Sequence, residues 1–248
     1  MLHYLPKNER KLVKNKPKQP QIKLLPRVIP PLAGAEFVSK MEDVPDGYRR
    51  PVDPARALVC MDEAARQLIG ETRVPLAAKP GEVLREDYEY VCNGVANFFM
   101  FHAPLEGKRH VTVTARRTKK DWARVVRELV DVHYPRAEKI ALVMDNLNTH
   151  TSASLYETIP PAEAKRIVGK LEIHHTPKHG SWLNMAGIES GVLGRQCLDR
   201  RIGEFTVFEK EVAAWEADRN ASKAKVNWQF THDDARVKLV RLYPSTEG

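Results

Sequence analysis

"KRHVTVTARRTKKDWARVVRELVDVHYPRAEKIALVMD", residues 108–145, changes its hydrophobic period twice, and these changes indicate the fold class. Residues 108–117 alternate apolar and polar side chains, which is typical of a β-strand with one buried face. Residues 118–135 place apolar side chains at the spacing of an amphipathic helix. Residues 138–145 return to a short apolar run that ends on Asp145. This order predicts a helix that connects two strands of one sheet.

The flanking segments extend the pattern. Residues 56–62, "RALVCMD", read as a buried strand that ends on Asp62, and residues 87–104 read as a second strand or strand pair. Further elements are expected as a short helix at 33–44, a helix at 160–170, a strand at 171–177 and helices near 182–199, 206–221 and 232–242. The order predicts an α/β fold with a mixed sheet: three antiparallel strands, then parallel additions, flanked by helices. The ribonuclease-H-like architecture has this order, and other α/β folds also allow it.

The net charge of +8 is concentrated at the N-terminus. Residues 1–27 hold eight Lys or Arg against one acid, or +7, which leaves +1 for the other 221 residues. Residues 1–31 also contain six prolines, so we expect a basic arm or linker there and one globular domain over residues 32–248. Such an arm suits a polyanion such as DNA, with Lys11 and Lys14 as candidate contacts, although a solvated arm without a specific partner has the same composition.

The composition also bears on the cellular compartment. No apolar stretch is long enough to span a bilayer, and the lysine-rich N-terminus lacks the apolar core of a signal peptide. The three cysteines are far apart and no pair has CxxC spacing, which argues against a disulfide framework or a zinc site. A cytoplasmic protein without a membrane partner is therefore expected.

Two acids follow the apolar runs of predicted strands. Asp62 and Asp145 would meet if their strands are neighbours, and a divalent cation would relieve their repulsion. Carboxylate oxygens favour Mg²⁺ or Mn²⁺, and two such ions can support phosphodiester cleavage. Acids at strand ends are also ordinary turn residues, so the pattern alone leaves both interpretations open.

Four motifs resemble the DDE transposases of bacterial insertion sequences, in the IS-six-thirty branch related to mariner-type elements. They are "CMDEAARQLIGE" (60–71), "VMDNLNTH" (143–150), "LEIHHTPKHGSWLN" (171–184) and "GRQCLDRRI" (194–202). The resemblance extends from about residue 35 to residue 244. It implies a ribonuclease-H-like catalytic domain that uses two Mg²⁺ or Mn²⁺ ions to cut and join element ends. It also implies that Asp62 and Asp145 are the first two catalytic acids and metal ligands.

The third acid departs from this family pattern. In related proteins it comes three residues after a Leu-Asn pair, which here is Leu183-Asn184, so the expected position is 187, occupied by glycine. Glu189 is the candidate substitute, but two residues along a helix turn a side chain by about 200°. Glu189 lies in an apolar stripe, so its carboxylate needs a metal, an arginine or a backbone cap as partner, unless it is exposed. Arg195 and Arg200 are the candidate arginines.

Several other residues are candidates for binding DNA. Lys178 and His179 precede the helix near 182–199 and could contact phosphates, whereas Trp182 in the same loop favours a core position over base stacking. His150 could contact a phosphate, orient a water or cap a helix. A basic cluster follows the strand at 108–117 and suits either a DNA backbone or solvent; it comprises Arg116, Arg117, Lys119 and Lys120.

These expectations define the functional hypotheses. The first is a transposase whose activity is impaired at Gly187, acting on element ends and target DNA in the bacterial nucleoid. The second is a non-catalytic DNA-binding remnant, and a third is a cellular nuclease on the same fold. Transposases of this group carry helix-turn-helix modules before the catalytic domain, and residues 1–31 lack the apolar period of such a module. A separate chain that supplies end recognition and a second copy of this chain are therefore candidate partners.

Overall fold

The structure, a computed structural model, describes residues 34–83, 85, 87–147 and 150–244. The predicted basic arm, with Lys11 and Lys14, lies outside the described residues. The helices are α1 Ala35–Gly47, α2 Lys119–Glu128, α3 Ser152–Tyr156, α4 Pro161–Lys170, α5 Met185–Gln196, α6 Phe205–Ala221 and α7 His232–Lys238. The strands are β1 Arg56–Glu71, β2 Tyr90–Ala103, β3 Lys108–Thr114, β4 Lys139–Met144 and β5 Leu171–His175. Short 3₁₀ turns at Ser181–Leu183 and Val240–Leu242, and a π-turn at Leu129–His133, complete the order.

The five strands form one mixed sheet in the order β3-β2-β1-β4-β5. β1, β2 and β3 pair antiparallel, and β4 and β5 are added parallel to β1. This arrangement is the predicted α/β, ribonuclease-H-like order, so the predicted fold class is confirmed. Strands β4 and β5 each follow a crossover segment that contains a helix, as predicted at residues 118–135 and 160–170. Such segments are required because parallel strands cannot be joined by a tight turn.

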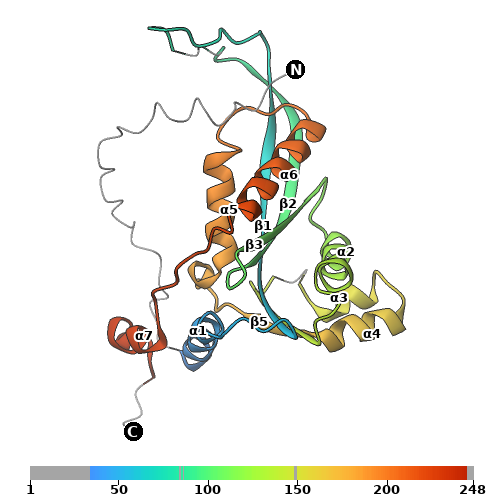
Figure 1. Cartoon of the computed structure of the whole chain (residues 1–248), viewed down its shortest axis with the longest axis vertical. Coiled ribbons are helices and arrows are strands. Elements are labelled where there is room, and N and C mark those ends of the chain that lie inside the picture. The colour runs from blue at the N-terminus through green and yellow to red at the C-terminus, as the bar shows by residue number, and fades with distance from the viewer. Residues whose placement is uncertain (1–33, 84, 86, 148–149, 245–248) are drawn as a thin grey trace.

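Strand β1 is longer than predicted. We expected it to end at Asp62, but it continues to Glu71 because β2 pairs with it along its whole outer part, from Cys60 opposite His102 to Glu71 opposite Tyr90. The strands β1 and β2 therefore extend well beyond the rest of the sheet (Figure 1). What ends near Asp62 is the pairing of β1 with β4, whose last matched residues are Cys60 and Val143. Asp62 and Asp145 each lie two residues past that pair.

Helices cover both faces of the sheet (Figure 1). Neighbouring residues of a strand point to opposite faces, and both faces are buried, which explains the continuous apolar runs in the sequence. One buried cluster joins the sheet to α1, α5 and α6, and includes Leu58, Phe98, Leu193, Phe208 and Trp215. The other joins it to α2, α3 and α4, and includes Val59, Phe99, Trp122, Ile140 and Leu155. Among the described residues, no helix is both long and apolar enough to cross a membrane.

Candidate active site

The two predicted acids line one pocket of about 780 Å³ at the sheet rim, next to the start of α5. Asp62 projects from β1 and Asp145 directly follows β4. Burial raises the pKa of Asp62 to about 6, and the nearby carboxylates of Asp145 and Glu63 add to the rise. The structure therefore brings together two acids that are 83 positions apart in the sequence, in a setting that disfavours their simultaneous negative charge.

His150 contacts the carboxylate of Asp145. The ring Nδ1 of His150 lies 2.8 Å from Asp145 Oδ1, and its Nε2 lies 2.6 Å from Glu63 Oε2. The ring is buried and stacks on Trp122, with centroids 5.7 Å apart. Burial disfavours the charged imidazole, but the two carboxylates outweigh that effect and raise the pKa of His150 to about 9. A charged His150 thus links Glu63, the neighbour of Asp62, to Asp145.

Asn184 fixes the start of α5 against β1. Its Oδ1 accepts the backbone N–H of Ala186 at 3.0 Å, which caps the helix, and its Nδ2 donates to the carbonyl of Met61 at 2.6 Å. Met61 precedes Asp62, so the same amide sets the distance between the helix and the acid. A Cβ atom built at Gly187 would lie 3.4 Å from Asp62 Oδ2. Position 187 therefore faces Asp62, and its glycine supplies no ligand there.

Glu189, the candidate substitute for the third acid, is not among the residues that line this pocket. It is fully buried; Arg109 Nε donates to its Oε2 at 2.9 Å, and Arg219 donates to both of its oxygens at 3.2 and 3.1 Å. Burial opposes its charge, yet the two arginines lower the pKa of Glu189 to about 2. The turn of about 200° between positions 187 and 189 directs this side chain away from the pocket. Its partners are also not Arg195 or Arg200.

Comparison with known proteins identifies the family. The family model described as "DDE superfamily endonuclease" matches residues 57–208, more than half of the chain.

The chain belongs to the DDE superfamily endonucleases.

The matched range contains Asp62, Asp145 and Gly187. It does not distinguish branches, so the IS-six-thirty assignment stays a prediction.

The fold of this DDE endonuclease is similar to that of the Mos1 mariner transposase. One similar structure is the Mos1 mariner paired end complex with Mn, at a TM-score of 0.52 and 11% identity over 90% of this chain. Another is the Mos1 transposase paired-end complex with left transposon end, at a TM-score of 0.52 and 11% identity over 87% of this chain. The chain spans 64% of the Mos1 chain in both cases. In sequence, no curated protein matches it.

Asp62 and Asp145 are the candidate metal ligands of this DDE endonuclease. Carboxylates are the ligands that Mg²⁺ and Mn²⁺ prefer. Burial is the main cause of the raised pKa of Asp62, and a bound cation would offset the smaller contribution from the repulsion of Asp145. In the part of the chain that the structure describes, no group of three or more His, Cys, Asp or Glu side chains is arranged to hold a metal ion. Asp62 and Asp145 together fit a divalent cation whose other ligands are water.

The predicted DNA contacts fall into two groups. His179 lines the pocket with Asp62 and Asp145, and exposed Lys178 is its neighbour. Trp182 also lines this pocket but packs edge-on against Phe230, with centroids 5.2 Å apart, so it contributes to the core as well.

The basic cluster after β3 is exposed, as expected of either a DNA contact or a solvated face. Arg117 lies 3.9 Å from Glu63, and Lys119 is paired with Glu157 at 2.6 Å. Arg116 and Lys120 have no ion pair with any described residue. The contacts of Glu189 with Arg109 and Arg219, and of Glu63 with His150, were not predicted, because these partners are far apart in the chain.

Proposed function

We propose that this chain is the catalytic domain of a transposase that cleaves and joins DNA phosphodiesters with Mg²⁺ or Mn²⁺, and that its turnover is impaired. The observation that carries the proposal is the shared pocket of Asp62 and Asp145 in a DDE endonuclease. The observation that carries the impairment is that position 187 faces Asp62 and is glycine. Similar structures of Mos1 contain Mn or a transposon end, which supports the choice of metal and DNA.

In this proposal Asp62 and Asp145 hold the cation. A bound divalent ion would activate the attacking water or 3′-hydroxyl and stabilise the departing oxygen. His150 orients Asp145 through the contact with its Oδ1, which leaves the Oδ2 atom available for a cation. Lys178 and His179 contact the phosphate backbone of the strand that enters. Gly187 leaves the second expected ion without its own carboxylate, which is the source of the impairment.

The test is cleavage of supercoiled plasmid DNA in Mn²⁺ by the natural chain and by Gly187→Glu and Gly187→Asp. We expect each of the two variants to nick DNA about 100-fold faster than the natural chain, or more. Losing a residue that only supports a metal ligand already costs up to about 100-fold, and a direct ligand should matter at least as much. The double variant Gly187→Glu/Asp62→Asn should lose this gain, which excludes a contaminating nuclease. Equal nicking by the natural chain and Gly187→Glu would show that the missing acid at position 187 does not limit turnover, and would overturn the proposed impairment.

A non-catalytic DNA-binding role is the second candidate. The charge of +7 in residues 1–27, together with Gly187 in the pocket, favours it. It predicts DNA retention in EDTA that falls steeply with salt, does not require Asp62 or Asp145, and is lost on deletion of residues 1–27. Restored nicking by Gly187→Glu would show that the machinery is otherwise intact. No nicking by either acid variant, with salt-sensitive retention, would favour the remnant.

A further inference from the structure

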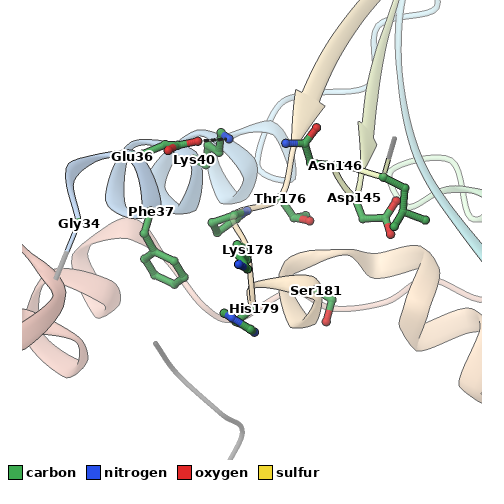
Figure 2. A pocket seen from close by; sticks show the side chains of 12 residues that line it. Gly34, Glu36, Phe37, Lys40, Asp145, Asn146, Thr176, Lys178, His179 and Ser181 are labelled. Atoms are coloured by element: carbon green, nitrogen blue, oxygen red, sulfur yellow. Dashed lines mark hydrogen bonds and ion pairs between the residues drawn. The ribbon is translucent and has the colours of Figure 1, made fainter. Parts of the chain in front are cut away.

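A second pocket of about 800 Å³ adjoins the one that contains the two acids. It lies between α1 and the segment that follows β5, and Figure 2 shows the side chains that line it. Both pockets include Asp145, His179 and Ser181 in their linings. The second pocket is therefore a continuation of the candidate active site past Asp145, with a volume in the range of small-molecule sites.

The lining combines an aromatic ring with cations. Phe37 extends from α1 into this space, and Lys178 and His179 reach it from the opposite segment (Figure 2). Lys40 also lines it, but its ammonium group is paired with Glu36 at 2.6 Å. Within the described residues, the side chains of Lys178 and His179 have neither an ion pair nor a hydrogen bond. An aromatic face beside two unpaired basic side chains is the composition of a single-strand nucleic-acid site.

A tight turn holds the two basic residues in place. Pro177 and Gly180 are buried, and the N–H of Gly180 donates to the carbonyl of Pro177 at 2.8 Å. His179 has a φ of 64°, in the left-handed region that a non-glycine residue seldom adopts. A Cβ at Gly180 would lie 2.5 Å from the ring of Pro177, so only glycine closes the turn without displacement. The turn therefore exposes Lys178 and His179 while its ends stay fixed, as positioned binding residues require.

We propose that this pocket binds one unpaired nucleotide of the DNA strand whose phosphodiester lies at Asp62 and Asp145. The base stacks on Phe37, and the adjoining phosphate is contacted by Lys178. This inference rests on the proposed function and adds to it a substrate feature: the strand must be unpaired next to the reacting phosphodiester. The shared wall at Asp145 and His179 supports this occupant, because a strand bound at the acids continues directly into the second pocket.

The test compares a blunt DNA duplex with a forked duplex that has one unpaired strand, by fluorescence anisotropy in EDTA. The full chain should bind the fork about tenfold more tightly, the size expected of one stacked base. The basic arm contributes to both substrates, so their affinity ratio isolates the pocket. Phe37→Leu should abolish the preference, and Phe37→Tyr should keep it. Lys178→Ala should weaken fork binding, whereas Lys210→Ala, on the exposed side of α6, should leave it unchanged.

Because Phe37 also packs against the core, a second arm alters the DNA instead of the protein. An abasic residue at the first unpaired position should remove the preference of the natural chain, and one placed several nucleotides away should not. Failure of the abasic fork to weaken binding would overturn the proposal. A preference for the fork that appears only after residues 1–27 are deleted would also overturn it. In that case residues 1–27 would occupy the pocket in the full chain. Binding of neither DNA would contradict the proposed function, whereas equal binding of both would contradict only the nucleotide site.

Discussion

Replacing Glu189 with glutamine tests whether this acid stabilises the fold or binds metal. The change keeps the size of the side chain but removes the charge that compensates Arg109, whose side chain is completely buried, and Arg219. Removing one partner of a buried ion pair leaves an uncompensated charge and typically costs about 3–5 kcal/mol. The pKa of Glu189 gives a similar size: a fall from 4.5 to about 2 corresponds to about 3 kcal/mol of stability near neutral pH. A domain of ordinary stability, about 5–15 kcal/mol, would lose much of its margin.

The assay is urea unfolding at pH 7, followed by tryptophan fluorescence and circular dichroism. The natural chain should also lose stability in acid, because a lowered pKa stabilises the fold above about pH 4.5 and this contribution is lost as the pH falls through about 2. Glu189→Gln should start less stable and show a smaller loss over that range. Arg219→Met, which removes the partly exposed partner, is the matched variant and should be milder. A Glu189→Gln chain as stable as the natural one, but deficient in Mn²⁺ binding, would refute the reasoning.

Three further outcomes follow from other contacts. In EDTA, the raised pKa of His150 predicts that its charge stabilises the fold fully below about pH 6.5 and that this contribution is lost as the pH rises through about 9. The urea unfolding midpoint should show this loss in the natural chain and not in His150→Gln. Gly203→Ala should cost about 1–3 kcal/mol in urea unfolding because its Cβ would lie 2.8 Å from the backbone of Gly70, whereas Gly169→Ala, with open space around it, should gain about 0.4–1 kcal/mol. Deleting residues 1–27 should flatten the slope of log affinity for DNA against log salt, measured by anisotropy; an unchanged slope would assign the binding to the folded domain.

The sheet could be predicted from the sequence because its determinants are local. Residues 108–145 change period at the elements that the structure contains, and continuous apolar runs mark strands buried on both faces. The length of β1 could not be predicted in the same way. Its outer half is partly exposed and forms a strand because β2 pairs with it. The residues of β2 that determine its length are therefore distant from it in the sequence.

The candidate site was only partly predictable for a related reason. Asp62 and Asp145 follow apolar runs, which is a local signal in the sequence. They lie close together because β1 and β4 are neighbouring strands. The partners of Glu189 come from β3 and α6, and no spacing in the sequence relates them to α5. A weak signal existed at Arg109, which shares the strand register of Val111 and Val113 and so occupies an inward position. An inward arginine requires a buried acid, and Glu189 was the acid without a partner.

Positions 187 and 189 of α5 have different surroundings: position 187 faces Asp62, whereas Glu189 is buried between two arginines. An acid at 187 would face Asp62 and Asp145, so in the absence of metal its repulsion would destabilise the fold, whereas glycine costs a helix no more than about 1 kcal/mol. A chain can therefore lose the acid at 187 and keep its fold, but it cannot lose Glu189 at the same cost.

This asymmetry predicts the response of Gly187→Glu to metal. In EDTA the variant should unfold at a lower temperature than the natural chain, because three carboxylates would share one rim. With Mn²⁺ at about 100 times its Kd, binding to the folded state should add about 2.7 kcal/mol and reverse the order. Gly187→Gln is the control, since it adds similar bulk without charge and should respond to Mn²⁺ as the natural chain does. Equal shifts of the unfolding temperature with Mn²⁺ for all three chains would mean that position 187 does not reach the cation, and the link between Gly187 and lost turnover would fail.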